Sequence, residues 1–141
     1  MKTLHRDERG QSLVELALIL PVLMLIVTGL FDVARAVWQE NTLAYAAREG
    51  TRYAIVHGSA AASPVGPTNT SDPTIAAIVR AAAIGVPNIT ITTSWPDLNN
   101  DRNSRVSVDA SAPFVPLPSQ YLLGGAFQIT LRGGSLLIIE R

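Results

Sequence analysis

An uncharged apolar run from Leu16 to Phe31 constrains the fold of this chain more than any other feature. At roughly 1.5 Å per helical residue the run is about 24 Å long, so a ~30 Å hydrocarbon core also needs its apolar flanks, over about 13–36. A chain of 141 residues has little other apolar material with which to enclose such a helix. The run therefore predicts one membrane-spanning helix.

The charges before this run predict its orientation. Lys2, Arg6 and Arg9 precede it, and basic residues before a first hydrophobic helix favour the cytoplasmic side. We therefore expect a single-pass protein of the inner or cytoplasmic membrane. Its N-terminus would lie in the cytoplasm and its C-terminal head outside it.

The helix should extend beyond the membrane to about Val56, because the sequence has neither Gly nor Pro from Phe31 to Glu49. Phe31, Trp38 and Tyr45 recur at intervals of seven residues. On a helix they form one aromatic stripe, which we expect to cover the helix's own head domain.

The head is predicted to contain a short helix and an antiparallel sheet, which makes the fold class α+β. Asp72 and Pro73 are typical of an N-cap and a first-turn proline, and Gly85 would close that helix. The last third alternates apolar and polar residues, as strands with one wet face do. The side chains expected to face the long helix are Ile89, Ile91, Val106, Val108, Phe127, Ile129 and Leu131.

Two glycines leave the number of strands open. Gly133 and Gly134 are consistent with a hairpin turn or with a bulge inside one strand. The predicted sheet accordingly has three or four strands.

Composition argues against several classes of function. The chain has 11 basic and 11 acidic residues and no cysteine, so it shows neither the basic surface of a nucleic-acid binder nor thiol chemistry. Its two histidines, His5 and His57, lie in no cluster of carboxylates or nucleophiles. We predict no catalytic residues, no cofactor and no small-molecule substrate.

One polar loop resembles the start of a calcium site. It places oxygen ligands at alternate positions, as an EF-hand does, but Arg102 replaces the loop glycine and Val108 the final glutamate. A polar turn with side-chain-to-backbone bonds is the preferred alternative. The weak calcium candidates are Asp97, Asn99, Asp101 and Asn103.

The junction of the charged start and the apolar helix carries a more specific signal. Gly10 ends the charged start, and Glu15 lies five residues later inside the helix. A carboxylate in a membrane segment is costly without a partner. Cleavage after Gly10 would place the new α-amino group of Gln11 about one turn from Glu15, where an ionic contact within or between subunits would favour ordered assembly.

This start resembles the type IV pilin-like proteins, and the residues that follow narrow the resemblance to the TadE-like pseudopilins of tight-adherence (Flp) pili. The shared motifs are Arg9, Gly10, Val14 and Glu15; Leu20 and Pro21; Asp32 and Arg35; and Asn41, Ala46, Ala47, Arg48, Gly50 and Arg52.

The resemblance implies a minor structural subunit, cut by a prepilin peptidase between Gly10 and Gln11. Its partners would be other pilins or pseudopilins and the pilus assembly platform proteins, and it could enter a surface pilus or a related secretion filament. The chain would then comprise a leader peptide (1–10), a long helix (11–57) and an extracytoplasmic head (58–141).

Two alternatives remain open. Asp32 and Arg35 are one helical turn apart and could form a solvated salt bridge or an inter-subunit pair. Ala34, Arg35 and Ala36 have the small-x-small pattern of a signal peptidase site. Cleavage there would give a secreted or membrane-anchored extracytoplasmic binding domain, with a mature N-terminus at Val37 if the signal is removed.

Overall fold

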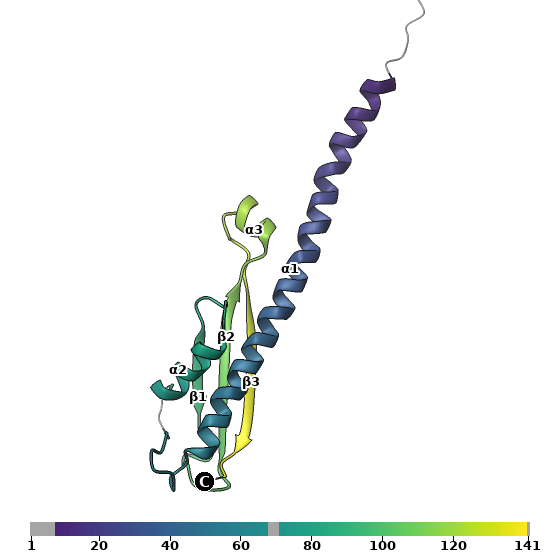
Figure 1. Ribbon diagram of the computed structural model, residues 1–141. Coiled ribbons are helices and arrows are strands. Elements are labelled where there is room, and N and C mark those ends of the chain that lie inside the picture. Colours follow the sequence, from purple (N-terminus) through teal and green to yellow (C-terminus); the bar gives the residue numbers. More distant parts are fainter. Residues whose placement is uncertain (1–7, 68–70, 141) are drawn as a thin grey trace, which may run out of the picture.

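The computed structural model describes residues 8–67 and 71–140 and has the predicted α+β fold, with a long helix beside a small head (Figure 1). Residues 1–7 of the expected leader lie outside the described part. The elements, in chain order, are α1 (Glu8–Val56), α2 (Pro73–Ala82), β1 (Thr90–Ser94), β2 (Arg105–Phe114), α3 (Leu117–Leu122) and β3 (Ile129–Ile138).

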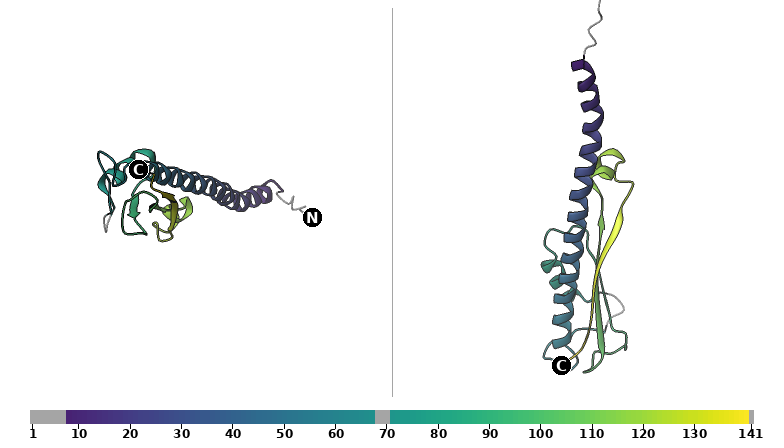
Figure 2. Two further views of the ribbon diagram at one scale, coloured as in Figure 1. Left: turned by 90° about the horizontal axis from the view of Figure 1, so that it is seen from below. Right: turned by 90° about the vertical axis from the view of Figure 1, so that its right-hand side faces the viewer.

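Helix α1 is continuous through Pro21 and ends at Val56, where its end was predicted. Its N-terminal half projects beyond the head, and its C-terminal half lies along the sheet (Figures 1 and 2). One continuous helix therefore has an N-terminal half that projects from the head and a C-terminal half that packs on it.

Helix α2 begins as its sequence predicts. The carboxylate of Asp72 accepts hydrogen bonds from the backbone nitrogens of Thr74 at 2.9 Å and Ile75 at 3.3 Å, which satisfies two amides of the first turn. Beyond the helix, Gly85 has a φ of 78°, a conformation that glycine adopts without strain. The predicted start is confirmed, whereas the helix ends at Ala82 with Ala83 as its C-cap, before the predicted Gly85.

The sheet is antiparallel, has the order β1-β2-β3, and contains three strands. Strands β2 and β3 pair residue for residue from Arg105 opposite Ile138 to Phe114 opposite Ile129. Gly133 and Gly134 therefore form neither a hairpin turn nor a bulge, and both predictions for them were wrong. A Cβ on Gly133 would lie 2.2 Å from the backbone nitrogen of Ala44, so this glycine permits close contact between β3 and α1.

The predicted inward face of the sheet is correct at its centre and wrong at one end. Ile91, Val106 and Val108 are buried, and Ile89 and Leu131 are partly buried. Phe127 precedes the strand and is exposed, as is Ile129. Ile129 does pair with buried Phe114, but it is the first residue of the edge strand β3, and its side chain is 40% exposed.

The core lies between α1, α2 and the sheet. On α1 it uses mainly small residues, which allow the helix to approach its neighbours closely. The main core residues are Leu43, Ala46, Ala47, Ala54, Ile75, Val79, Val106, Val108 and Ala110.

Candidate membrane-anchor and assembly site

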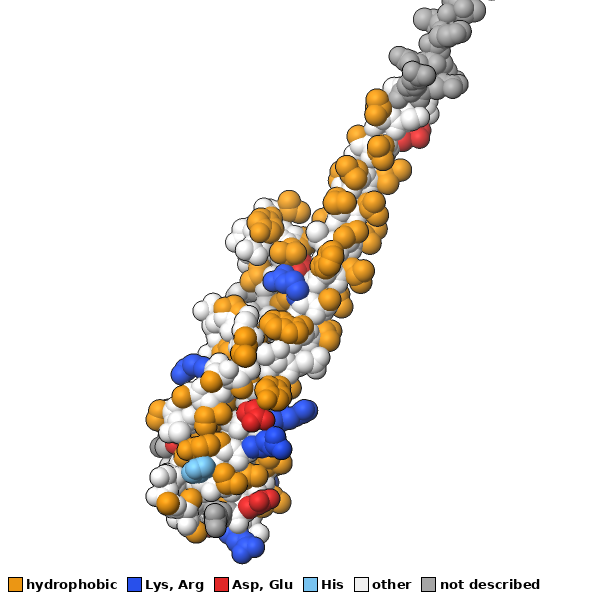
Figure 3. All heavy atoms as spheres, in the orientation of Figure 1, with side chains coloured by type: hydrophobic (Ala, Val, Ile, Leu, Met, Phe, Trp, Pro, Cys, Tyr) orange, Lys and Arg blue, Asp and Glu red, His pale blue; other side chains and the backbone are white. Residues whose placement is uncertain are grey.

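The N-terminal half of α1 carries its apolar side chains outward. Residues 11–27 are all exposed, and Figure 3 shows hydrophobic side chains along this stretch. Among the described helices, α1 is the one long and apolar enough to cross a membrane, and its most apolar window is not buried against the head. This surface is compatible with a single membrane-spanning helix.

Glu15 is the one acidic residue between Gly10 and Asp32. Its carboxylate accepts a hydrogen bond from the side-chain nitrogen of Gln11 at 3.1 Å. The two side chains thus lie on one face of α1, one turn apart, as the spacing predicts. If cleavage made Gln11 the first residue, its positively charged α-amino group would lie close to this carboxylate.

Where α1 meets the head, Asp32 connects α1 to α3. One carboxylate oxygen contacts Arg35 Nη1 at 2.8 Å, and the other accepts a hydrogen bond from the backbone nitrogen of Leu117 at 2.8 Å. Arg35 also lies over the ring of Phe114, 5.3 Å from its centroid. The predicted helix-surface pair forms, and its acid fastens α3 to α1.

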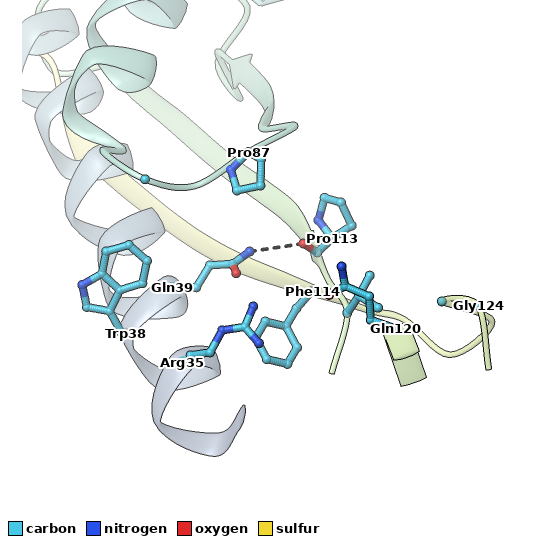
Figure 4. Close-up of a pocket in the computed structure, with 11 residues that line it drawn as sticks. Arg35, Trp38, Gln39, Pro87, Pro113, Phe114, Gln120 and Gly124 are labelled. Carbon is cyan, nitrogen blue, oxygen red and sulfur yellow. Dashed lines mark hydrogen bonds between the residues drawn. The ribbon is translucent and has the colours of Figure 1, made fainter. Parts of the chain in front are cut away.

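A second polar contact lies one turn further along α1. The side-chain nitrogen of Gln39 donates to the carbonyl oxygen of Pro113 at 3.3 Å (Figure 4). Arg35, Gln39 and Phe114 line a pocket between α1 and the end of β2 (Figure 4). These contacts fix the end of β2, and hence the start of α3, against the helix.

The aromatic stripe does not cover the head, so that prediction was wrong. The exposed fractions of Phe31, Trp38 and Tyr45 are 63%, 53% and 55%. The head instead packs on the alanine- and glycine-containing face of α1, because small side chains allow closer contact with α2 and the sheet. The stripe remains more than half exposed, and Trp38 and Tyr45 only border the head, beside Ala82 and Ile84.

The motif around Ala46 has a packing role. Ala46, Ala47 and Gly50 are buried, and a Cβ on Gly50 would lie 2.5 Å from Cγ2 of Val79 on α2. Arg52 points outward and pairs with Glu49 at 3.3 Å. The small residues of this motif bring α2 onto α1, while its charged residues remain solvated.

The polar loop at residues 97–103 forms a network of turn contacts. Asp97 binds the Arg105 guanidinium through both oxygens, at 2.7 and 3.1 Å, and accepts from the Arg105 backbone nitrogen at 2.8 Å. These bonds from Arg105 lower the pKa of Asp97 to about 2. The oxygen of Asn99 accepts from the Asp101 nitrogen and the Ser104 hydroxyl, while Asp101 and Asn103 have exposed side chains.

This network matches the polar-turn alternative for the loop. In the described residues no group of three or more His, Cys, Asp or Glu side chains is placed to hold a metal ion. Calcium binding by the loop stays a prediction, with both oxygens of Asp97 already bound to Arg105.

A family comparison decides the relationship of the long helix. The sequence model of the TadE-like protein family matches residues 10–52. The helix is TadE-like. This match confirms the TadE-like resemblance predicted from the motifs, over residues 10–52 of the 141. No curated protein and no solved structure significantly matches the chain.

The TadE-like match begins at Gly10 and includes Glu15, Asp32, Arg35 and Gly50. It therefore covers the apolar N-terminal half of α1, the charged pair Asp32 and Arg35 that follows this half, and the motif that packs on α2. Residues 53–141 lie outside the matched range.

Sequence reasoning missed α3. This helix has only six residues and contains Pro118, so it offers too little periodicity to be recognised. One available signal was the absence of any charge between Asp109 and Arg132. That run includes the last inner-face residues of β2 (Ala110, Ala112 and Phe114) as well as α3 and the start of β3.

Proposed function

We propose that this chain is a minor pseudopilin, made as a precursor and cut after Gly10 by a prepilin peptidase. It assembles with other pilins or pseudopilins, through pilus assembly platform proteins, into a tight-adherence (Flp) pilus or a related secretion filament. Before assembly it is held in the inner or cytoplasmic membrane by α1, with its N-terminus in the cytoplasm and its head outside.

Glu15 is the observation that carries this proposal. Its carboxylate is exposed in an otherwise apolar stretch of helix that the head does not cover. Because this stretch is remote from the head's core, Glu15 does not stabilise that core. Its hydrogen bond from the side-chain amide of Gln11 supports the proposal, because cleavage would make Gln11 the first residue of the mature chain. An N-terminal ammonium on its own or a neighbouring subunit would neutralise it as the helix leaves the lipid.

The surface of the long helix supports assembly through helix-to-helix contacts. Phe31, Trp38 and Tyr45 form an apolar stripe along α1 that is more than half exposed at each of the three residues. Apolar side chains of this kind are suited to packing against the helix of a neighbouring subunit. For Asp32 and Arg35, we propose that the pair supports assembly by fixing the head at the start of that stripe.

Cleavage by signal peptidase after Ala36 is the alternative. It would remove Asp32 and Arg35, and with them the bond to Leu117 and the contact with Phe114. The loss of these contacts at the junction of helix and head disfavours the alternative.

N-terminal sequencing of the membrane-associated protein, produced together with a prepilin peptidase, tests the proposal. The expected mature chain begins at Gln11. It lacks Lys2, the only lysine in the sequence, so an amine-reactive label would mark it at most once, at its N-terminus. A mature chain that begins at Val37 would overturn the proposal in favour of a signal peptide.

Two glycine variants make this experiment specific to the cleavage bond. Gly10→Leu should block cleavage, because a side chain there crowds the bond that the peptidase must reach, and lysine-containing precursor should accumulate in the membrane. Gly29→Leu is the matched control on the same helix. A Cβ at either position meets no atom within 4 Å, so neither change should disturb the fold, and the control should be cut normally.

A further inference from the structure

Helix α3 and the turn after it form an apolar projection at the end of the head that faces the membrane half of α1. Figures 1 and 2 show α3 beside α1, beyond the paired part of β2 and β3. Tyr121, Leu122 and Leu123 are 78%, 70% and 63% exposed. Such a cluster of large apolar side chains at the tip of a projection is unusual for a surface in water.

The position of the projection along α1 places it at membrane level. It shares a shallow apolar groove with residues of α1, among them Pro21, Met24 and Leu25. Its first residue is held by Asp32. Leu25 and Pro21 lie seven and eleven positions before Asp32, so the groove extends to about 10 Å and about 16 Å from the charged exit, toward the middle of the span.

The composition of the projection also suits lipid. No charged residue occurs between Asp109 and Arg132. Tyr121 belongs to the projection and is 78% exposed, and tyrosine is enriched at membrane interfaces, where its ring is buried and its hydroxyl stays hydrated.

Several backbone groups of the turn are paired within the projection, which lowers the cost of leaving water. The Ser119 hydroxyl donates to the Phe127 carbonyl at 2.8 Å and accepts from the Phe127 nitrogen at 2.9 Å. The Ser119 carbonyl in turn accepts from the nitrogens of Leu123 and Gly125. Ser119 thus closes the turn and is itself buried.

From these observations we infer that α3 and residues 121–127 insert into the interfacial region of the bilayer leaflet that faces the head. This inference rests on the proposed insertion of α1. The occupant of the apolar surface is lipid: acyl chains fill the groove beside Leu25, and the headgroup region surrounds Tyr121. Interfacial segments bury their apolar face by roughly 5–10 Å, which is comparable to the ~10 Å along the helix axis between Leu25 and Asp32.

Insertion at this point would fix the orientation of the subunit before assembly. A single helix leaves the head free to tilt and rotate about its exit from the membrane. A second contact, clamped to α1 through Asp32, would hold the head upright with one face of α1 toward neighbouring subunits. The projection would also have to leave the lipid when the subunit is extracted into a filament.

Single-cysteine labelling tests the inference on the full chain, which has no cysteine of its own. An environment-sensitive fluorophore is attached to Leu122→Cys, with Leu123→Cys as a second reporter of the projection. Leu18→Cys, in the span, and Leu98→Cys, in the head loop, are reference sites with exposed fractions of 70% and 86% in the unsubstituted chain. The proteins are reconstituted into phosphatidylethanolamine–phosphatidylglycerol vesicles and quenched with lipid-borne nitroxide or aqueous iodide.

The expected result is several-fold stronger nitroxide quenching at positions 122 and 123 than at position 98, with several-fold weaker iodide quenching. Iodide quenching at both projection sites equal to that at position 98 would overturn the inference. So would protection that disappears as the protein is diluted in lipid, because a neighbouring subunit would then be the occupant. Absence of nitroxide quenching at position 18 would instead show that α1 itself is not inserted, against the proposed function.

Discussion

Gly133 on β3 lies against the backbone of α1 at Ala44 so closely that a Cβ on the glycine would fall 2.2 Å from the alanine nitrogen. The neighbouring Gly134 lies on the opposite face of the strand, where its Cβ would meet the Asp109 carboxylate oxygen at 2.5 Å. The first obstacle is helix backbone and the second is the end of a movable side chain. Two adjacent glycines therefore have different structural roles.

We expect Gly133→Ala to destabilise the head by about 3 kcal/mol or more, at or above the usual upper end for overpacking, because helix and sheet must separate. Gly134→Ala should change the free energy of unfolding by less than about 1 kcal/mol, since Asp109 can rotate away and alanine restricts the unfolded chain. Denaturant unfolding of both variants in detergent micelles measures the difference. Equal stabilities would mean that α1 and β3 are not in this close contact.

The bond from Asp32 to Leu117 predicts a local effect on α3. Asp32→Ala removes the acceptor of a 2.8 Å hydrogen bond, and bonds to charged groups contribute about 1.5–3 kcal/mol. Exchange of the Leu117 amide hydrogen should become roughly ten- to hundredfold faster, as read by NMR in micelles.

Glu49→Ala is the matched control for that measurement. It removes another acid that pairs with an arginine three residues later on α1, but it touches no part of α3. Its effect on the Leu117 amide should be negligible. Unchanged exchange in Asp32→Ala would show that other contacts hold α3 to the long helix.

The pair between Asp97 and Arg105 predicts a dependence of stability on pH. Hydrogen bonds from the Arg105 side chain and backbone lower the pKa of Asp97 from 3.8 to about 2 in the folded state. The unfolded chain then binds this proton more readily. The stabilisation is present above about pH 4 and is lost as pH falls toward 2.

Asp97→Asn should therefore be less stable than the wild type at neutral pH, and the difference should shrink between about pH 4 and pH 2. Thermal unfolding across this range measures it. Asp101→Asn, an exposed acid in the same loop, is the control and should show no comparable change. A constant difference for Asp97→Asn at every pH would contradict the role given to the charge.

How much of the fold could be predicted depends on how many residues each sequence pattern spans. The course of α1 to Val56 followed from a long uninterrupted helical composition, and α2 from its Asp72 cap and first-turn proline. The short helix α3 offered no comparable pattern. The glycine pair was misread because sequence alone does not distinguish a turn from a close contact with a distant element.

The aromatic stripe shows a second limit. A spacing of seven residues correctly placed Phe31, Trp38 and Tyr45 on one face of α1, but it could not say which face the head covers. That choice depends on packing distance, and the face with Ala46, Ala47 and Gly50 allows the closer approach. In the candidate site, the pairing of Asp32 with Arg35 was predictable from spacing, whereas the bond to Leu117 joins residues far apart in the sequence.

The last prediction separates the charge of Glu15 from its size. Glu15→Gln keeps the length of the side chain and a hydrogen-bonding partner for Gln11, but it removes the negative charge that would meet an N-terminal ammonium. The variant should insert in the membrane, be cut after Gly10 and keep the melting temperature of the head, because residue 15 is remote from the core. Incorporation with partner pilins should fall roughly ten- to hundredfold, as expected when a contact of about 1.5–3 kcal/mol is lost.

Glu40→Gln makes the same chemical change on the same helix, at an exposed position beyond the apolar stretch, and should leave incorporation unchanged. Pull-down of partner pilins and counts of pili per cell measure the outcome for both variants. A loss for both would indicate a general need for negative charge on α1. Normal pull-down and normal piliation with Glu15→Gln would show that the carboxylate has no part in assembly, because the variant alters the charge and little else at that position.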